Sequence, residues 1–304
     1  MGCTLVSDYI GDWLMIKAAS VRPRTLEQYA GLSRKICGAV GDRVLDDLTP
    51  AACAAVYAPE VGAGRARTAQ LLYNVLDMML RDAVGMGLLP SSPMAALRRP
   101  RYDGREIVPY AADETARLYD DPDHGIVWRL LGGTGLRRGE ACALRWSDCD
   151  LRGAQISVSR QLVRVGGRLI ESPPKSAAGI RMIPISAALV DDLRAHLLNQ
   201  ILMRRVSDYV ISCDGARVEP RTVNHWLSAA AEAAGVEDAH PHRFRHTYGA
   251  DAVSAGVDIR VLQRLLGHSN ISVTARYYAY VRPDVLRTAA DQIANFQRGV
   301  SPDF

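Results

Sequence analysis

Residues 239–280 read AHPHRFRHTYGADAVSAGVDIRVLQRLLGHSNISVTARYYAY, a window that sets histidines, arginines and tyrosines between apolar residues. His242, Arg245 and His246 stand at positions i, i+3 and i+4, so on a helix they share one face. The window therefore predicts a helix that presents a compact cationic and proton-donating cluster.

The second part of this window predicts a turn beside the cluster. Leu265-Leu266-Gly267-His268 is typical of a helix end with glycine in the left-handed cap, which places His268 where the chain turns. A polar turn and a short helical run follow, and the run carries Tyr277, Tyr278 and Tyr280. Histidines on helices are commonly structural, arginine clusters are commonly solvated, and neighbouring tyrosines commonly pack. The window indicates a catalytic site only if other segments of the chain supply further catalytic residues.

The composition is that of a globular protein with more than one domain. The chain has 304 residues, of which 48% are hydrophobic and 23% charged, and this length favours two domains. A net charge of +4 does not by itself establish a nucleic-acid partner. The six cysteines form no CxxC pair, so neither a disulfide framework nor a zinc knuckle is indicated. No long apolar run or leader is present, and we expect a cytoplasmic protein with no membrane contact.

The first domain is predicted to be helical over residues 1–97. Helices are expected at 4–19, at 25–39, from Thr49-Pro50 onward and at 65–84, with glycines between them. Several basic residues stand at helix starts and turns, where contacts to phosphate are common. They are Arg22, Arg24, Arg34, Lys35, Arg65 and Arg67.

Residues 98–110, RRPRYDGREIVPY, lack periodicity and predict a linker before a second domain at 111–304. Arg98, Arg99 and Arg101 could lie along a phosphate backbone, although a solvated linker fits equally well.

The second domain is predicted to be helical with one small sheet. Helices are expected at 112–120, 124–132, 187–203, 221–234 and near 284–297. Strands at 155–159, 168–170 and 180–185 predict a three-stranded antiparallel sheet, with Gly166-Gly167 turning the chain between the first two. A further short strand is expected at Tyr209–Ser212. The predicted fold class is mainly α with a small antiparallel sheet (α+β).

A phosphodiester transfer without a metal needs cationic donors, a nucleophile and an acid for the leaving oxygen. Arg137 follows Thr-Gly-Leu at a predicted helix start, where backbone N–H groups and a guanidinium can face one anion. Lys175 is the lysine of the loop before the third strand, one of only three in the chain. Taken alone, either residue is more commonly a surface group.

The combination resembles one family. Four segments occur in the order TGLRRGEACALRW (134–146), PKSAAGIRMIPI (174–185), HRFRHTYGA (242–250) and LLGHSNISVTARYY (265–278). Together they resemble the tyrosine recombinases, the phage-integrase and Xer-like enzymes. The resemblance covers the whole second domain. The helices of the first domain fit the family's core-type (SAM-like) DNA-binding domain, but less specifically.

The resemblance implies six catalytic residues: Arg137, Lys175, His242, Arg245, His268 and Tyr277. Tyr277, nine residues beyond His268, would be the nucleophile and form a 3′-phosphotyrosine without metal, ATP or other cofactor. Arg137 and Arg245 would clamp the phosphate, Lys175 would protonate the leaving oxygen, His242 would accept the tyrosine proton, and His268 would donate to a phosphoryl oxygen.

Several neighbouring residues have other expected roles. Glu140 is expected to support Arg137, Arg138 to support the site or contact DNA, and His246 to be structural. Many members carry histidine two residues after the nucleophile, where this chain has Ala279. A metal site at His240, His242 and His246 is disfavoured, because no HExxH glutamate is present and the arginines between the histidines repel a cation.

The partners implied by the resemblance are double-stranded DNA with core-type attachment sites and further copies of the chain, as a tetramer on paired sites. The resemblance also allows a directionality factor as a further protein partner. We expect a minimal recombinase without an arm-binding domain. A phage or mobile-element integrase is favoured over an Xer-like resolvase. If the protein is phage-encoded, it is expected in the cytoplasm of the host cell. A non-catalytic DNA-binding protein of this fold and a type IB topoisomerase remain alternatives. The last helix, with Val285, Leu286, Ala289, Ile293 and Phe296, could pack on its own domain or on a neighbouring protomer.

Overall fold

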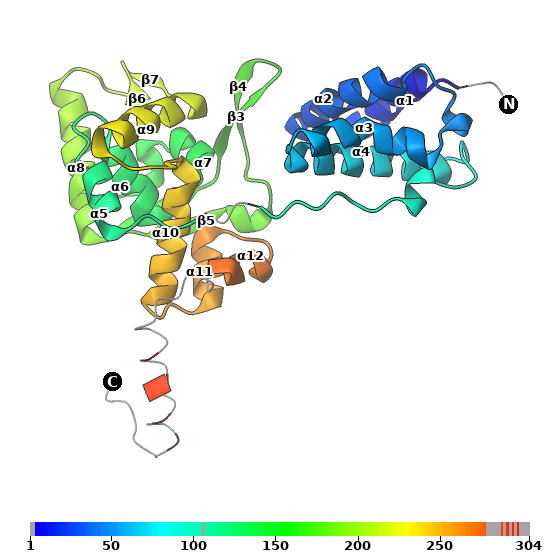
Figure 1. Cartoon of the computed structure of the whole chain (residues 1–304). Helices are drawn as coiled ribbons and strands as arrows, with labels where there is room; N and C mark the ends of the chain where they lie inside the picture. The colour runs from blue at the N-terminus through cyan, green and yellow to red at the C-terminus, as the bar shows by residue number, and fades with distance from the viewer. Residues whose placement is uncertain are drawn as a thin grey trace. The chain divides into compact units, whose positions relative to one another are not determined.

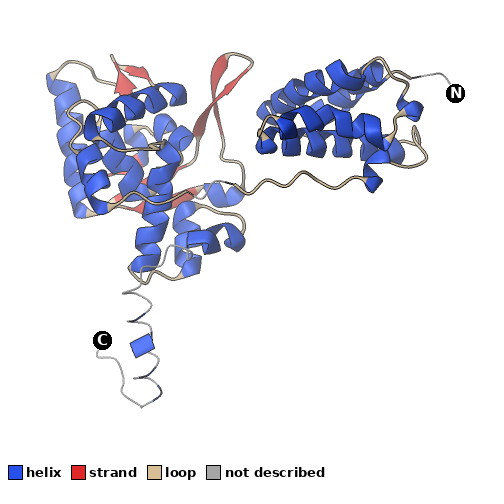
Figure 2. Ribbon diagram, viewed as in Figure 1, coloured by secondary structure: helices blue, strands red, loops and turns tan. Residues whose placement is uncertain are grey.

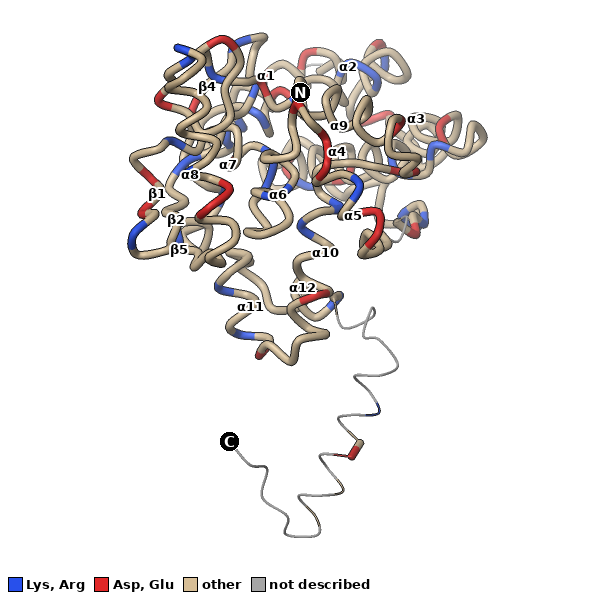
Figure 3. Tube along the Cα trace, turned by 90° about the vertical axis from the view of Figure 1, so that its left-hand side faces the viewer, with Lys and Arg blue, Asp and Glu red and all other residues tan. Residues whose placement is uncertain are grey.

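The computed structural model describes residues 4–104 and 107–277, together with Arg287, Ala290, Asp291, Ala294 and Gln297. The predicted C-terminal helix and the side chains of Tyr278 and Tyr280 therefore lie outside the described residues. The backbone divides into two compact units, Met1–Glu106 with Arg164–Arg168, and Ile107–Val163 with Leu169–Phe304. Basic residues are spread over many elements (Figure 3).

The first unit consists of helices packed side by side (Figure 1). They are α1 (Val6–Ala18), α2 (Pro23–Val40), α3 (Pro50–Gly62) and α4 (Ala66–Gly85), with single turns η1 (Leu45–Asp47) and η2 (Pro93–Ala96). The predicted cap at Thr49 is confirmed, because its side chain accepts a hydrogen bond from the backbone nitrogen of Ala52 at 3.2 Å. Trp13 and Leu76 are fully buried in the core.

The start of the segment predicted as a linker packs along α4. Tyr73 donates to the carbonyl oxygen of Leu97 at 3.1 Å, and the amide of Gln70 donates to that of Pro100 at 3.2 Å. The guanidinium of Arg67 stacks 5.3 Å from the ring centre of Tyr102. Residues 97–102 are therefore ordered against the first unit rather than free of it.

The second unit is also mainly helical, with short strands (Figure 2). Its helices are α5 (Ala112–Tyr119), α6 (Gly125–Thr134), α7 (Arg138–Ala143), α8 (Ala187–Leu202), α9 (Pro220–Ala234), α10 (Pro241–Ser254), α11 (Ile259–Leu266) and α12 (Ile271–Ala275), with single turns η3 (Trp146–Asp148) and η4 (Ala177–Gly179). Within the described residues, no helix is both long and apolar enough to cross a membrane.

The predicted strand pairing is wrong in one respect. The three-stranded antiparallel sheet has the order β1 (Cys149–Asp150), β2 (Gln155–Val158) and β5 (Arg181–Pro184). β4 (Arg168–Ser172) pairs instead with β3 (Gln161–Val165) in a separate ribbon. The Gly166-Gly167 turn does form, with both φ angles positive, but it joins β3 to β4. Most of β4 is exposed, so burial does not hold it in the three-stranded sheet.

The strand predicted at Tyr209–Ser212 is also displaced. Tyr209 forms an isolated bridge with Arg145, and the strand β6 (Ser212–Cys213) begins where the prediction ends, pairing with β7 (Ala216–Arg217).

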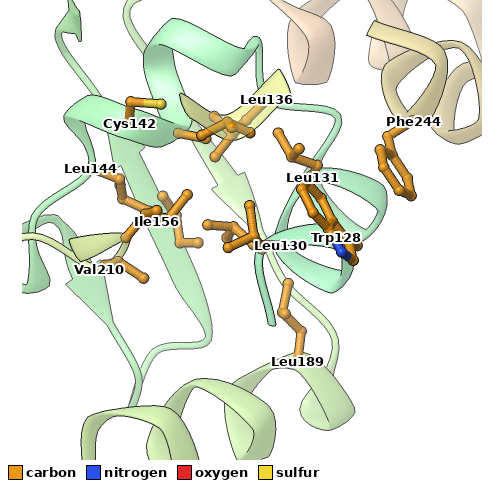
Figure 4. Close-up of a cluster of buried hydrophobic side chains, with 14 of the residues drawn as sticks. Trp128, Leu130, Leu131, Leu136, Cys142, Leu144, Ile156, Leu189, Val210 and Phe244 are labelled. Atoms are coloured by element: carbon orange, nitrogen blue, oxygen red, sulfur yellow. The ribbon is translucent and has the colours of Figure 1, made fainter. Parts of the chain in front are cut away.

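An apolar core positions α10. Trp128 of α6 and Phe244 of α10 are fully buried and stacked with ring centres 6.0 Å apart (Figure 4). The Trp128 indole donates to Asp121 at 2.8 Å, which satisfies its polar edge. α10 packs against both α6 and α11, and α11 against α12 (Figure 1). The residues of α10 that do not face this core are thus held against the end of α11.

Candidate active site

The helix predicted to carry His242, Arg245 and His246 is present as α10. The helix begins after His240, whose ring nitrogen Nδ1 accepts from the backbone nitrogen of Arg243 at 3.2 Å. His242 and His246 lie one turn apart, with ring centres separated by 5.2 Å. Arg245 lies between them in sequence and points inward, with 0% of its surface exposed.

Arg245 is anchored by carbonyl oxygens. Its Nη1 donates to Gly135 at 2.7 Å and its Nη2 to Leu266 at 2.5 Å, whereas its Nε has no partner within the described part of the chain. Burial, followed by the charge of Arg137, lowers the pKa of Arg245 to about 9, so the guanidinium is still charged at neutral pH. A buried cation with an unpaired donor is well suited to receive an anion.

A second arginine, Arg137, is fixed by a buried carboxylate. Arg137 is the N-cap of α7, as predicted from the helix start, and its backbone N and Nη1 donate to Glu140 at 3.0 and 2.8 Å. Its Nη2 reaches the carbonyl oxygen of Gly267 at 3.4 Å. Glu140 also accepts from Arg181, at 3.0 and 3.3 Å. Burial raises the pKa of Glu140, but the hydrogen bonds and charge of Arg181 and the charge of Arg137 more than offset this and lower it.

The predicted glycine cap precedes His268. α11 ends at Leu266, and Gly267 has φ of +66°, the left-handed conformation that glycine adopts without strain. His268 is 8% exposed, and its Nδ1 lies 3.0 Å from the hydroxyl oxygen of Thr274 in α12. The turn thus fixes the backbone of His268, and Thr274 fixes its ring.

Tyr277 packs inside this group and is 3% exposed. Its ring stands edge-on to His246, with centres 5.2 Å apart, and lies nearly parallel to His268 at 6.2 Å. A Cβ at Gly249 of α10 would come within 2.7 Å of this ring, so the close packing requires glycine. Burial raises the pKa of Tyr277, while the charges of Arg245 and Arg137 act in the opposite direction.

The three histidines of the cluster are held neutral. Desolvation and the charges of His246 and Arg245 lower the pKa of His242 to about 4, although His242 is an exposed residue. Desolvation and the charges of His240 and Arg245 lower that of His246 to about 4. The pKa of His268 falls to about 3, through desolvation and then the charges of Arg245 and Arg137. Each ring is therefore uncharged at neutral pH and keeps one nitrogen with a free lone pair.

The structure places Lys175 in the exposed segment between β4 and η4. The described contacts bring together the other five predicted catalytic residues with Glu140 and His246. The segment of Lys175 approaches them at η4, because a Cβ on Gly267 would meet the carbonyl oxygen of Ala178 at 2.7 Å.

The arginines predicted to contact DNA are not among the residues that these contacts join. Arg138 donates to Asn224 of α9. The side chains of the remaining seven are exposed: Arg22, Arg24, Arg65, Arg67, Arg98, Arg99 and Arg101. Arg65 is paired with Glu60, which also binds Lys35.

Sequence reasoning missed Arg181, Thr274 and Gly249. Arg181 and Thr274 lie within the quoted segments, but their partners could not be read from spacing. Arg181 is six residues beyond Lys175, and Thr274 is three residues before Tyr277. A polar residue at either place in a buried strand or turn is a weak signal by itself. Among the described residues, no group of three or more histidine, cysteine or acidic side chains is placed to hold a metal ion.

Comparison with known proteins identifies the family. A model of the phage integrase family matches residues 111–283, more than half of the chain. The chain belongs to the phage integrase family.

Two relatives with similar sequences are a prophage integrase and a bacterial XerC-like recombinase. The chain is 29% identical to a putative prophage phiRv2 integrase of Mycobacterium tuberculosis, over 89% of this chain and 73% of the relative. It is 27% identical to a XerC-like tyrosine recombinase of Caldanaerobacter subterraneus, over 75% of this chain and 66% of the relative. The chain thus spans slightly less than two thirds of the XerC-like relative.

Solved structures of phage integrase folds are also similar. The integrase of transposon Tn1549, in complex with a circular intermediate DNA, superimposes with a TM-score of 0.82 at 19% identity, over 95% of this chain and 100% of that one. A lambda integrase tetramer bound to a Holliday junction gives 0.72 at 20% identity, over 91% and 78%. At these identities the likeness establishes the fold.

Proposed function

We propose that this chain is a site-specific DNA recombinase that cleaves and rejoins DNA through Tyr277. The observation that carries the proposal is a fully buried guanidinium, Arg245, that has no ion-pair partner among the described residues. It donates to two carbonyl oxygens and hydrogen-bonds to Tyr277, a side chain that is 3% exposed. Burying a charge without a counter-ion costs several kcal/mol. A phosphate group would supply that counter-charge, and the tyrosine supplies a nucleophile.

The first step is attack by the Tyr277 hydroxyl oxygen on the scissile phosphorus. The new bond joins that oxygen to phosphorus, the bond from phosphorus to the 5′ oxygen breaks, and a 3′-phosphotyrosine and a free 5′ hydroxyl result. His242, neutral because its pKa is lowered to about 4, takes the phenolic proton. Lys175 protonates the leaving oxygen. Rejoining reverses these transfers, so the bond energy is conserved and no ATP is needed.

The phosphoryl oxygens are held by Arg137, Arg245 and His268. Each donor aimed at charge that develops in the transition state is typically worth about 10²–10³ in rate. Arg137 and Arg245 each retain N–H groups beyond those that bind protein carbonyls and Glu140. Glu140 orients Arg137, and His246 packs edge-on against the nucleophile.

The DNA partner is bound by both units. Exposed arginines of the first unit and of residues 98–101 contact phosphate, and the first unit acts as a core-type DNA-binding domain. A tetramer on paired attachment sites carries out the exchange through a Holliday junction, with a directionality factor as a further partner. The prophage and transposon integrases among the relatives favour a phage or mobile-element integrase acting in the host cytoplasm. The Xer-type relatives keep a resolvase as the second candidate.

Covalent trapping tests the proposal. A binding site is first selected from a random duplex pool with the Tyr277→Phe protein, and nicked suicide duplexes carrying that site are then incubated with the wild-type chain. We expect a covalent adduct that maps to Tyr277 and is lost in Tyr277→Phe. Site-specific binding with no adduct would instead identify a non-catalytic DNA-binding protein. An adduct together with relaxation of supercoils on unpaired sites would identify a type IB topoisomerase.

A further inference from the structure

Arg181, at the start of β5, has a side chain that is 5% exposed and donates four hydrogen bonds. Its Nε donates to the carbonyl oxygen of Leu265 at 2.7 Å, and its Nη1 to that of Gly179 at 3.0 Å. Its Nη1 and Nη2 also donate to the two carboxylate oxygens of Glu140, at 3.3 and 3.0 Å. The proposed mechanism gives Arg181 no role.

The partners of Arg181 belong to three separate segments of the site. Glu140 is the carboxylate that fixes Arg137. Leu265 is in the last turn of α11, two residues before Gly267 and three before His268. Gly179 closes η4, which follows Lys175. One planar guanidinium therefore links the elements that carry three of the proposed catalytic residues.

Gly267 packs closely against the Arg181 side chain. A Cβ on Gly267 would come within 3.0 Å of the Arg181 side chain, as well as 2.7 Å from the carbonyl oxygen of Ala178. A lysine at position 181 could still neutralise Glu140. Its single ammonium lacks the rigid fork that reaches a carboxylate and two carbonyl oxygens at once.

We propose that Arg181 is a positioning residue that sets Arg137, His268 and the Lys175 segment at the spacing needed for strand cleavage. This inference rests on the proposed function. The guanidinium does not reach the phosphate itself; it acts through Glu140 and the two carbonyl oxygens. Misplacement of reacting groups by about 1 Å can cost about a hundredfold in rate.

The test compares Arg181→Lys with wild type in the full chain. Two quantities are measured: the single-turnover rate constant of covalent adduct formation on the suicide duplex at saturating protein, and the dissociation constant of the same variant in a Tyr277→Phe background. We expect the rate constant to fall about 10- to 100-fold, with the dissociation constant within about threefold of the parent. A residue that merely stabilises the fold would not separate these two quantities.

Arg243→Lys is the matched control. Arg243 is likewise buried at 9% exposure, donates to the carbonyl oxygens of Val108 and Glu237, and pairs with Glu114 at 2.9 Å. Its partners carry none of the proposed catalytic residues. We expect a loss of thermal stability similar to that of Arg181→Lys, with adduct formation within about threefold of wild type.

A second variant covers the case in which Arg181→Lys does not fold. In the double variant Glu140→Gln, Arg181→Gln the buried ion pair is replaced by neutral amides, and we expect a folded protein that still cleaves slowly. Wild-type cleavage rates in either folded variant would overturn the positioning role while leaving the proposed function intact. Absence of an adduct with the wild-type chain would instead overturn the proposed function.

Discussion

The ring of Tyr277 lies almost parallel to that of His268, with 8° between their planes and 6.2 Å between their centres. Both side chains are buried, and Thr274 lies 3.0 Å from Nδ1 of His268. A hydroxyl that donates to Nδ1 leaves the proton on Nε2. The geometry of one hydroxyl group therefore decides whether His268 can donate to a phosphoryl oxygen.

Thr274→Val removes this hydroxyl at nearly constant volume. We expect the rate constant of covalent cleavage to fall about tenfold or more, because the imidazole is free to adopt the wrong tautomer. Thr274→Ser, which keeps the hydroxyl, should retain activity within about threefold. Equal cleavage rates for the valine and serine variants would show that Thr274 does not set the tautomer.

Gly249→Ala tests the packing of the Tyr277 ring against α10. Because the new Cβ would lie 2.7 Å from the Tyr277 ring, the ring must shift, and we expect cleavage to slow at least tenfold. Overpacking typically costs about 1–3 kcal/mol, which exceeds the gain of about 0.5–1 kcal/mol from replacing a helical glycine. Urea unfolding should therefore show net destabilisation.

Gly38→Ala in α2 is the control for the glycine effect. No atom lies within 4 Å of a Cβ at Gly38, so this variant should gain stability and cleave normally. A Gly249→Ala protein that is stabilised as much as Gly38→Ala and is fully active would contradict the packing at Tyr277.

The histidine cluster predicts acid sensitivity of the free protein. The pKa values of His242 and His246 are lowered to about 4 and that of His268 to about 3, from an ordinary value of 6.5. Between the lowered pKa values of the folded state and the ordinary value of 6.5, the unfolded chain binds protons at these histidines that the folded chain does not. The free energy of unfolding should therefore decrease as pH falls below about 6.5, with the loss complete below about 3.

Urea unfolding at several pH values measures this slope. His246→Gln should flatten it, whereas His225→Gln, at an exposed position on α9, should leave it unchanged. Identical slopes for wild type and His246→Gln would refute the linkage. Since a bound phosphate anion favours protonated imidazoles, DNA binding near pH 6 should also take up protons, which calorimetry in buffers of different ionisation enthalpy detects.

Arg98 and Arg99 predict a salt effect on DNA affinity. Both are exposed, and each phosphate contact contributes about −0.9 to the slope of log affinity against log salt concentration. Replacing both by alanine should make this slope shallower by about 2, with the cleavage rate at saturation nearly unchanged. Arg194→Ala on α8, at a side chain that is 56% exposed, is the control. An unchanged slope would exclude these arginines from the DNA interface.

The parts of the fold that could be predicted are those set by local chemistry. Thr49-Pro50 forms a cap, Gly267 adopts a left-handed conformation, and the spacing of His242 and Arg245 places both on one helix. The ribbon of β3 and β4 was mispaired because a Gly-Gly turn specifies a hairpin but not which strand forms its other arm. Strand pairing depends on burial across the sheet, which sequence spacing does not report.

The support of the site was harder to predict than its reactive groups. The link between Arg181 and Glu140 joins residues far apart in sequence, and Arg181 is satisfied largely by carbonyl oxygens, which every residue possesses. The exposed fraction of Tyr277 could not be predicted either, since nothing in the sequence indicated that this side chain would be almost completely buried. The catalytic roles themselves rest on the resemblance and await the trapping experiment.

Under the proposed function, the burial of Tyr277 also limits where DNA can be cleaved. Recombinases of this kind meet very many phosphodiester bonds for each correct site. A phenol that is 3% exposed is sheltered from most of these encounters by His246, His268 and the backbone of α10. Under the proposed function, the resting protein then binds DNA without cleaving it, and cleavage is confined to sites that bring a phosphate to Arg245 and Tyr277.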